Sequence, residues 1–503
     1  METRPVAALA LVAVLVLAGC TAGYQPASTS AAPEPSGSPA DGDPLGYYDG
    51  YWHNDSLDVD PESGLTESEL EAVVARAMAR VQLVRGLRFE EDVEVDLVTR
   101  EEFREEYGGI TVGNPSGPRQ RLDNAQHEAL FLVGPDEDVV EVRRDNRGDS
   151  VLGFYRPGAG DLVLVSESVP ATLEDEFTLA HELDHALQDQ HFDLSSLEGR
   201  TLDETNARNG LVEGDALVVQ QAYERRCERG EWQCVGTESS GGQPGVSEDF
   251  HFGVYYAGFF PYAEGPSFVR YHREQGGWER VNGLYGDVPT TSAAVVHPST
   301  YDSGVYGNAT VEDRNAPSWE RVRVDGGASH ATVGQAGLTS MFAYTLNDQY
   351  APNRSVIDRS EFINLQDGRL DPRRPFTYDV RYAEGWYADR LHAYENGGRT
   401  AYVWNVTFVD RANATEFERG HERIVEYWGG ERRATRSGGV VWTFGEAGPF
   451  DGAVWVRVEG SSVTVVKAPT VEALDAVYAP ASGPARASMS APARPSGAGV
   501  TEA

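Results

Sequence analysis

The residues whose types and spacing could do chemistry are His181, Glu182 and His185, which form the motif H-E-x-x-H. On an α-helix, residues i and i+4 lie on nearly the same face one turn apart, so both imidazoles can reach one metal ion. Two neutral histidines and a carboxylate form a ligand set for catalytic zinc that leaves one position for water, and zinc lowers the pKa of that water toward ~7. The motif therefore predicts one Zn²⁺ ion bound by both histidines, with Glu182 as the general base that accepts a proton from the water.

A third ligand is required, and Glu213 is the first choice because it lies on the next expected helix, which a helix–loop–helix return could bring to the metal. Gly214 beside it would permit close approach of another helix. His191 is the alternative, since H-E-x-x-H-x-x-G-x-x-H would place a third histidine at that position. This chain has Gln188 where that longer motif has glycine, and a continuing helix would turn His191 away from His185. The sequence therefore favours Glu213.

The elements that must position these residues are two helices and a hairpin. The motif helix is expected to begin after Thr172 as N-cap, with Asp175 at N3, and to bury one apolar face. A β-hairpin is expected over 151–167, where two β-rich runs flank Pro-Gly-Ala-Gly-Asp. A second helix, which carries Glu213, is expected over 205–227. The elements expected before the hairpin are a capped helix over 66–86, a strand over 92–99 and a short helix over 101–107.

The pattern changes in the C-terminal part of the chain. Strands are expected over 401–409, 440–444, 453–458 and 462–466, and helices over 414–428 and 470–478. No cluster of catalytic residue types is evident there. The sequence therefore predicts an α+β protein, with a domain over 46–312 that carries the motif and a second α+β domain over 313–479.

The N-terminal residues predict export and lipid attachment. Arg4 precedes an apolar run over 6–18, which is too short to span a bilayer and is typical of a signal peptide over 1–20. Leu-Ala-Gly-Cys at the end of this run resembles a lipobox, in which Cys20 receives a lipid that holds the protein on the outer face of the cell membrane. Small and polar residues over 21–45 predict a disordered tether, and residues 480–503 predict a disordered tail.

Two further features fit an exterior location. Cys227 and Cys234 are an even pair that predicts a disulfide, whereas a thiolate metal site would need further cysteines. Asn-x-Ser/Thr triplets predict N-glycosylation acceptors. They occur at Asn54, Asn308, Asn353, Asn405 and Asn413.

The charge balance bears on environment and on partners. The formal net charge is −37, and Lys467 is the only lysine of the chain. This balance is typical of halophilic archaea, where concentrated salt screens repulsion between surface carboxylates, although an acidic protein encoded by GC-rich DNA is the alternative. Such a charge repels phosphates, so we expect no nucleic-acid partner and no broad contact with an anionic membrane surface.

The segment HELDHALQDQHFDL followed by LVEGDA resembles zinc metallopeptidases of the gluzincin type. The phrase GFYRPGAGDLVLV and residues 261–301 are more similar still to a group of largely uncharacterised haloarchaeal surface lipoproteins. The resemblance implies a zincin-like domain, with a small sheet, an active-site helix and following helices, that hydrolyses a peptide or protein substrate. It also implies that Leu162 to Val165 form the edge strand that pairs with the extended substrate.

Two parts of the gluzincin pattern are not met. Where such proteins often hold the first histidine with an aspartate, this chain has Ala216 and Leu217, so Asp184, Asp189 or Asp215 must be considered instead. The donor to the transition state is also open. Its candidates are Tyr262, His251, His272, His297 and Tyr301. The alternatives to an exported, lipid-anchored zinc hydrolase are a catalytically inactive surface-binding lipoprotein with a metallopeptidase-like fold and a structural envelope protein with a fortuitous motif.

Overall fold

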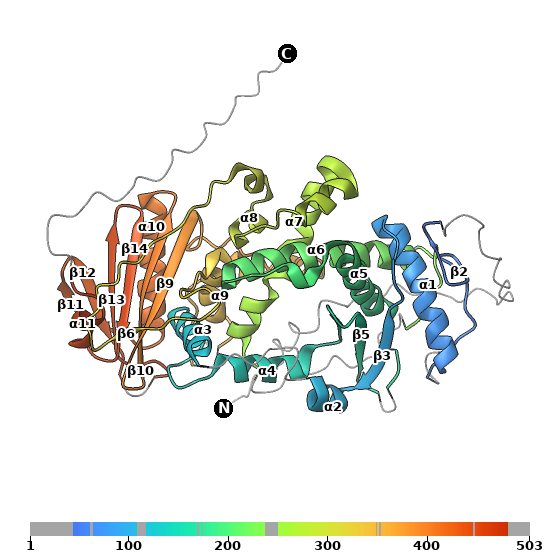
Figure 1. Ribbon diagram of the computed structural model, residues 1–503. Helices are drawn as coiled ribbons and strands as arrows, with labels where there is room; N and C mark the ends of the chain where they lie inside the picture. The colour runs from blue at the N-terminus through green and yellow to red at the C-terminus, as the bar shows by residue number, and fades with distance from the viewer. Residues whose placement is uncertain are drawn as a thin grey trace, which may run out of the picture. The chain divides into compact units, whose positions relative to one another are not determined.

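The computed structural model describes residues 44–480, except 61–63, 108–116, 169–170, 174, 237–249, 349, 352–353 and 446–447. Over these residues the chain is a mixture of helices and strands, as the sequence predicts (Figure 1). The expected signal peptide, which includes Cys20, lies outside the described residues, as do the expected tether except residues 44–45 and the expected C-terminal tail except residue 480.

The chain forms two compact units that exchange segments. Unit 1 comprises Met1–Pro115, Asp138–Asp302 and Phe362–Tyr378, and unit 2 comprises Ser116–Glu137, Ser303–Glu361 and Asp379–Ala503. The division at Asp302/Ser303 is close to the boundary expected at 312/313. However, each unit contains one segment from the other half of the sequence, and nothing in the local residue pattern indicates this exchange.

Helix α1 of unit 1 spans Glu67–Arg85 and has the ends that the sequence predicts. The Thr66 side chain accepts a hydrogen bond from the Glu69 backbone N–H, and the Glu69 carboxylate accepts one from the Thr66 backbone N–H, which completes a capping box. Gly86 ends the helix with a φ of 78°, a conformation that glycine adopts without strain. The small hairpin β1 (Tyr47–Tyr48) and β2 (Tyr51–Trp52) precedes it.

A three-stranded sheet of unit 1 has the order β3-β5-β4, from β3 (Glu94–Thr99), β5 (Asp161–Ser166) and β4 (Gly153–Arg156). β4 and β5 form the expected antiparallel hairpin, and β3 pairs with β5 in parallel. The expectation that Leu162 to Val165 form an edge strand is therefore wrong. They lie in the central strand, because β3 covers the side that would have been free, and the free edge beside the hairpin belongs to β4. α2 (Arg100–Glu102) and a π-helical turn (Phe103–Tyr107) follow β3.

The motif lies in α5 (Glu176–Phe192). Its N-cap is Asp175, whose Oδ1 accepts hydrogen bonds of 2.7 Å from both Phe177 N and Thr178 N. The expected cap at Thr172 is wrong, because the carboxylate of Asp175 satisfies two backbone donors at once and the helix begins three residues later. α6 spans Leu202–Glu228 with Thr201 as N-cap, so it begins slightly before the expected residue.

Helix α7 (Phe252–Leu284) packs against α6 at a contact between two glycines. A Cβ added at Gly214 would lie 2.4 Å from the carbonyl carbon of Gly265, so only glycine allows this approach. The close approach expected at Gly214 is thus made by α7. Farther along, α7 is kinked at Gly276 and Gly277, whose dihedral angles are not helical. The remaining elements of unit 1 are α4 (Val139–Ser150), a 3₁₀ turn (Leu194–Ser196), α8 (Ser292–Val296), a 3₁₀ turn (Pro298–Ser303, whose last residue belongs to unit 2), β7 (Leu365–Gln366) and β8 (Arg369–Leu370).

In the described part of unit 2, one antiparallel sheet has seven strands in the order β11-β12-β13-β14-β10-β9-β6. The four expected strands correspond to β10, β12, β13 and β14. The strands are β6 (Glu320–Arg321), β9 (Trp386–Asn396), β10 (Arg399–Phe408), β11 (Glu431–Arg436), β12 (Gly439–Thr443), β13 (Ala453–Glu459) and β14 (Ser462–Ala468). The helices are α3 (Pro118–Ala129), α9 (Gly334–Tyr344), α10 (Arg411–Tyr427) and α11 (Ala473–Val477), with a 3₁₀ turn at Arg359–Glu361.

The exchanged helix α3 is fixed to the sheet by a buried ion pair. Glu128 of α3 pairs with Lys467 of β14, and both side chains are 6% exposed. Asp451 lies 3.4 Å from the same ammonium group. Two carboxylates therefore surround the only lysine of the chain, and their charges raise its pKa against the opposing effect of burial.

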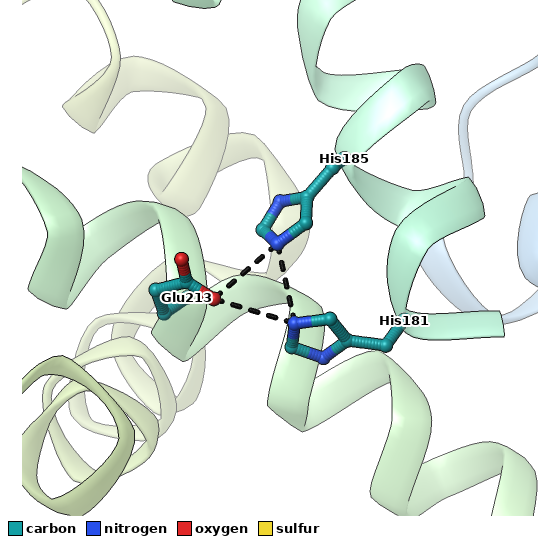
Figure 2. Close-up of side chains that lie close together, drawn as sticks. All are labelled: His181, His185 and Glu213. Carbon is teal, nitrogen blue, oxygen red and sulfur yellow. Dashed lines mark hydrogen bonds and ion pairs between the residues drawn. The ribbon is translucent and has the colours of Figure 1, made fainter. Parts of the chain in front are cut away.

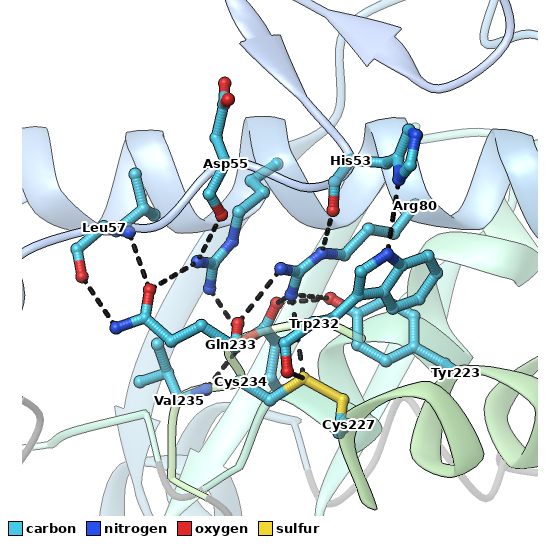
Figure 3. Close-up of polar contacts among 12 residues, drawn as sticks. His53, Asp55, Leu57, Arg80, Tyr223, Cys227, Trp232, Gln233, Cys234 and Val235 are labelled. Atoms are coloured by element: carbon cyan, nitrogen blue, oxygen red, sulfur yellow. Dashed lines mark hydrogen bonds and ion pairs between the residues drawn. A yellow bond between two sulfur atoms is a disulfide. The ribbon is translucent and has the colours of Figure 1, made fainter. Parts of the chain in front are cut away.

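The N-terminus of α5 is held by a buried polar network around Glu176. Figure 3 shows the part of this network that Arg80, Tyr223 and Gln233 form next to the disulfide. Glu176 accepts hydrogen bonds from Arg76 (3.0 Å) and Arg80 (2.7 Å) of α1 and from Tyr223 of α6. Cys227 and Cys234 are joined as a disulfide. The loop that this disulfide closes carries Gln233, whose carbonyl accepts from Arg80, and leads to Val235, whose N–H donates to Glu176. The disulfide thus closes the loop that completes the surroundings of Glu176.

We expect Cys227→Ser with Cys234→Ser to lower the free energy of unfolding by about 2–3 kcal/mol, because the unfolded chain gains the freedom of a short closed loop. Urea unfolding of both proteins measures this difference. Reductant should destabilise the parent protein in the same way and leave the double variant unchanged. An equal midpoint for variant and parent would show that the loop holds without the disulfide.

Candidate metal centre

The motif histidines and Glu213 converge on one point in unit 1 (Figure 2). His181 Nε2 and His185 Nε2 lie 3.2 Å apart, and Glu213 Oε2 lies 3.3 Å from each of them. α5 presents both imidazoles one turn apart, and α6 presents the carboxylate. Among the described residues, this is the only group of three histidines, cysteines or acidic residues with the spacing of a metal site.

The spacing of the three atoms fits a tetrahedral zinc ion. Ligands bound at about 2.0–2.1 Å in tetrahedral geometry lie about 3.3 Å from one another. The set of two imidazole nitrogens and one carboxylate oxygen also matches the preference of zinc and leaves one position for water or substrate. The residues present therefore fit the ion that the sequence predicts.

The orientation of His185 is fixed by Gln188. The amide nitrogen of Gln188 donates to Asp184 Oδ2 (2.9 Å) and to the Val212 carbonyl (3.1 Å), so its Oε1 must face His185. His185 Nδ1 lies 3.0 Å from that oxygen and is therefore the protonated nitrogen. Its Nε2 then presents a lone pair to the other two ligands, as metal binding requires.

His181 is oriented in the same way by Gln220. The amide nitrogen of Gln220 donates to Glu224 Oε1 (2.9 Å), which leaves its Oε1 at 3.1 Å from His181 Nδ1. The neutral ring of His181 therefore carries its proton on Nδ1 and leaves Nε2 as the nitrogen that can bind a metal ion. When both imidazoles are neutral, two lone pairs and one carboxylate oxygen face one another within 3.3 Å, an arrangement that favours a metal ion or a proton between them.

Neither glutamine is among the residues predicted from the sequence to contribute to the site, although the spacing of each from a ligand could have indicated it. Gln188 follows His185 by three residues on the same helix, and Gln220 lies two turns after Glu213 on the same helix. Of the three aspartates considered, only Asp184 takes part, through Gln188. Asp215 pairs with Arg85 and Tyr285, and Asp189 accepts from the Tyr155 hydroxyl and the Leu194 N–H.

We expect Gln220→Met to weaken zinc binding about 10–100-fold, because the imidazole of His181 loses the acceptor that fixes its tautomer. Gln220→Glu keeps an acceptor for His181 and should bind zinc far better than the methionine variant. Competition with a chromogenic chelator measures both affinities, and the absorption spectrum of the cobalt-substituted protein reports the ligand geometry. Equal zinc affinity in the methionine variant and the parent would contradict this role.

The charge at the site also favours a cation. Burial opposes the imidazolium form of His185, but the Glu213 carboxylate outweighs burial and raises the pKa of His185 to about 10. Burial likewise opposes ionisation of Glu213, yet the two imidazoles hold the pKa of Glu213 well below its usual range. In the metal-free protein a proton therefore occupies the position between these groups, and a metal ion would displace it.

The metal-free protein should lose stability as the pH rises from about 6.5 to about 10. The pKa of His185 is raised on folding from its unfolded value near 6.5, so the stabilisation is complete below that value and is lost as the pH passes the folded value. Thermal unfolding of chelator-treated protein across this range tests the direction. Zinc replaces the proton, so the zinc-loaded protein serves as the control and should lose less. Parallel profiles for both forms would contradict the proton–metal exchange.

Glu182 lies between the two histidines in sequence, and its side chain faces β4, an edge strand of the three-stranded sheet. Burial raises the pKa of Glu182, the effect that a proton acceptor needs, and the backbone N–H of Tyr155 donates to its carboxylate. Gly153 of β4 approaches the same side chain, because an added Cβ would lie 3.2 Å from Glu182 Cγ. The free edge of the sheet therefore lies next to the candidate base.

Of the five candidate donors, Tyr262 is the one that reaches the site. It lies on α7, and its hydroxyl forms a hydrogen bond with the Glu213 carboxylate, while burial raises its pKa well above the ordinary value. The other four hold the fold elsewhere. His251 caps α7, the His272 ring packs against Phe268 and Tyr301, His297 ends α8, and the Tyr301 hydroxyl donates to the Asp287 carbonyl.

His191, the alternative ligand, does not join the cluster. Its Nε2 lies 2.7 Å from the Arg88 carbonyl, to which it donates, and its Nδ1 lies 3.8 Å from Glu90. Without the glycine turn of the longer motif, α5 continues past Gln188 and carries His191 to the last turn of the helix.

The sequons differ in accessibility. Asn54 and Asn308 are exposed and lie outside helices and strands, whereas the Asn405 side chain of β10 donates to the Thr310 carbonyl and Asn413 lies in the first turn of α10. Asn353 lies outside the described residues. In the part of the chain that the structure describes, no helix has the length and apolar character needed to cross a membrane.

The comparisons with known proteins reach only the C-terminal part of the chain, which comprises most of unit 2 and the segment Phe362–Tyr378 of unit 1. Residues 320–478 match a family described as a domain of unknown function (DUF8575). No curated protein and no solved structure matches the chain. The matched residues contain none of the three converging ligands, so an argument about function must rest on the chemistry of the site.

Proposed function

We propose that the protein is a zinc-dependent hydrolase that cleaves peptide bonds. The observation that carries this proposal is the convergence of two imidazole Nε2 atoms and one carboxylate oxygen within 3.3 Å of one another, with Glu182 beside them. His181, His185 and Glu213 would hold one zinc ion, which when bound lowers the pKa of water and polarises a carbonyl group.

The residues of the chain supply the remaining functions. Glu182, whose pKa burial raises, takes the proton of the attacking water and passes it to the leaving amine. Leu152 accepts a backbone hydrogen bond from Val165 of β5, and alternate residues of a strand face the same side. The backbone of Gly153 therefore faces away from β5, on the open edge of β4. An extended peptide can add to this edge as a further strand. Tyr262 holds the Glu213 carboxylate from the side of α7.

The arrangement of unit 1 supports a zincin-like fold of the gluzincin type. It has a small sheet, a motif helix beneath the free edge strand, and a second helix that returns with a glutamate ligand. The lipobox at Cys20 supports anchoring on the outer face of the cell membrane. The disulfide between Cys227 and Cys234 supports the same location, since such bonds persist in oxidising surroundings.

The test is metal content together with turnover. Purified full-length protein in molar KCl should contain one zinc ion per chain and should hydrolyse an unfolded, casein-like substrate. A zinc chelator should abolish hydrolysis, and added zinc should restore it. Zinc without hydrolysis of any substrate would indicate the inactive surface-binding lipoprotein, and absence of zinc would overturn the proposal.

A further inference from the structure

Three arginines of unit 1 lie on neighbouring elements and have no carboxylate partner. They are Arg225 of α6, Arg270 of α7 and Arg373 of the segment after β8, and we call them the arginine cluster. Among the described residues, no carboxylate lies within 4.0 Å of their guanidinium groups. Neighbouring arginines do have such partners. Arg226 and Arg229 pair with Glu231, and Arg374 pairs with Glu264.

Two contacts hold the elements that carry these arginines against one another. Arg270 donates a hydrogen bond to the Gln221 side chain, and Gln221 lies one helical turn before Arg225 on α6. Arg374, next to Arg373, donates to both carboxylate oxygens of Glu264 on α7, at 2.9 and 2.7 Å. The segment after β8 is thereby held on α7, and α7 is held on α6.

The positive charges of the cluster act on one another. Burial lowers the pKa of Arg225, and the charges of Arg373 and Arg229 lower it further. Burial also lowers the pKa of Arg270, followed by the charges of Arg225 and Arg373. Glu224, Glu228 and Glu274 on the same helices offset this effect only in part. Guanidinium groups keep their charge at any ordinary pH, so the repulsion persists unless an anion binds.

We propose that the arginine cluster binds a multiply charged oxyanion, a phosphate or sulfate group. A guanidinium group binds two oxygens of such an anion at once, and a tetrahedral anion offers oxygens to several guanidinium groups together. A single carboxylate carries one charge and cannot neutralise three. The chain as a whole carries −37, so three arginines on neighbouring elements without a carboxylate partner are a local exception that attracts anions.

The experiment measures the thermal unfolding of the full-length protein with sodium sulfate or phosphate against sodium chloride at equal ionic strength. The parent protein should show a saturable rise in Tm with either oxyanion. Arg225→Gln with Arg270→Gln and Arg373→Gln should lose this rise and have an equal or higher Tm in chloride, because mutual repulsion is removed. Arg280→Gln is the matched control, since Arg280 lies on the same helix α7 but pairs with Asp302. It should keep the rise.

The control separates site binding from the general stabilising effect of these salts, which acts on every variant. An equal rise in the triple variant and in the parent would overturn the proposal. The single variant Arg373→Gln, at an exposed position, provides the same comparison if the triple variant does not fold. If a sulfated polysaccharide raises the Tm at a far lower sulfate concentration than free sulfate does, the natural ligand is a sulfate ester. If both raise the Tm at the same sulfate concentration, the natural ligand is the free anion. Both readings are independent of zinc and of hydrolysis.

Discussion

Glu182→Gln is expected to lower kcat about 10²–10⁴-fold while the zinc content stays at one ion per chain. Glutamine has nearly the same shape as glutamate and can still contact the Tyr155 backbone, but it cannot accept a proton from water. The raised pKa of Glu182 places its proton affinity closer to neutral pH, so the loss should be large at every pH where the parent protein is active. Steady-state hydrolysis and metal analysis of the same preparations measure both quantities.

Asp193→Asn is the matched control for this substitution. Asp193 is an exposed residue at the C-terminal end of α5 with a φ of 51°, a conformation that asparagine adopts readily. Its variant should keep both zinc and activity. Loss of zinc in Glu182→Gln would show that Glu182 shapes the site rather than accepting a proton, and full activity would remove it from the mechanism.

Glu213→Ala is expected to weaken zinc binding by more than about 100-fold, because two imidazoles alone leave too many open positions on the ion. Loss of a residue that only hydrogen-bonds to a ligand costs up to about 100-fold, and loss of a ligand itself should cost more. His191→Ala should bind zinc as the parent does, since its ring lies on the Arg88 carbonyl. Chelator competition at one pH compares the two variants directly.

Glu204→Gln controls for loss of a carboxylate from α6, because Glu204 lies in the first turn of the same helix and away from the three ligands. It should bind zinc normally. If Glu213→Ala kept its zinc while His191→Ala lost it, the third ligand would be the histidine of the longer motif. The helix would then have to turn at Gln188 in solution.

Local features of the chain are predictable because adjacent residues determine them. The capping box at Thr66 and the turn around Gly158 mark the ends of elements without reference to the rest of the fold. The spacing of His181 and His185 determines that both face one side once a helix forms. Glu213 could be proposed because it lies on the next apolar-patterned helix, and the structure brings its carboxylate to the histidines.

Features that depend on distant residues were not predictable in the same way. β5 is central because β3, far away in sequence, pairs with it in parallel, and its apolar run fits an edge or a centre equally well. Gln188 and Gln220 orient the histidines through neutral amides, whereas related sites suggest a carboxylate. The N-cap of α5 is Asp175 and not the expected Thr172. Both residues are good capping residues within one turn, and the sequence alone does not determine which of them begins the helix.

The burial of Lys467 between Glu128 and Asp451 has a consequence for chemical labelling. Because the sequence contains no other lysine, the folded chain offers no accessible ε-amine to an acylating reagent or to isopeptide-forming modification. Acylation at this position requires β14 and α3 to separate, so its rate reports the opening of unit 2 alone. One mass increment on one peptide would therefore record a local unfolding event that bulk melting cannot distinguish from changes elsewhere.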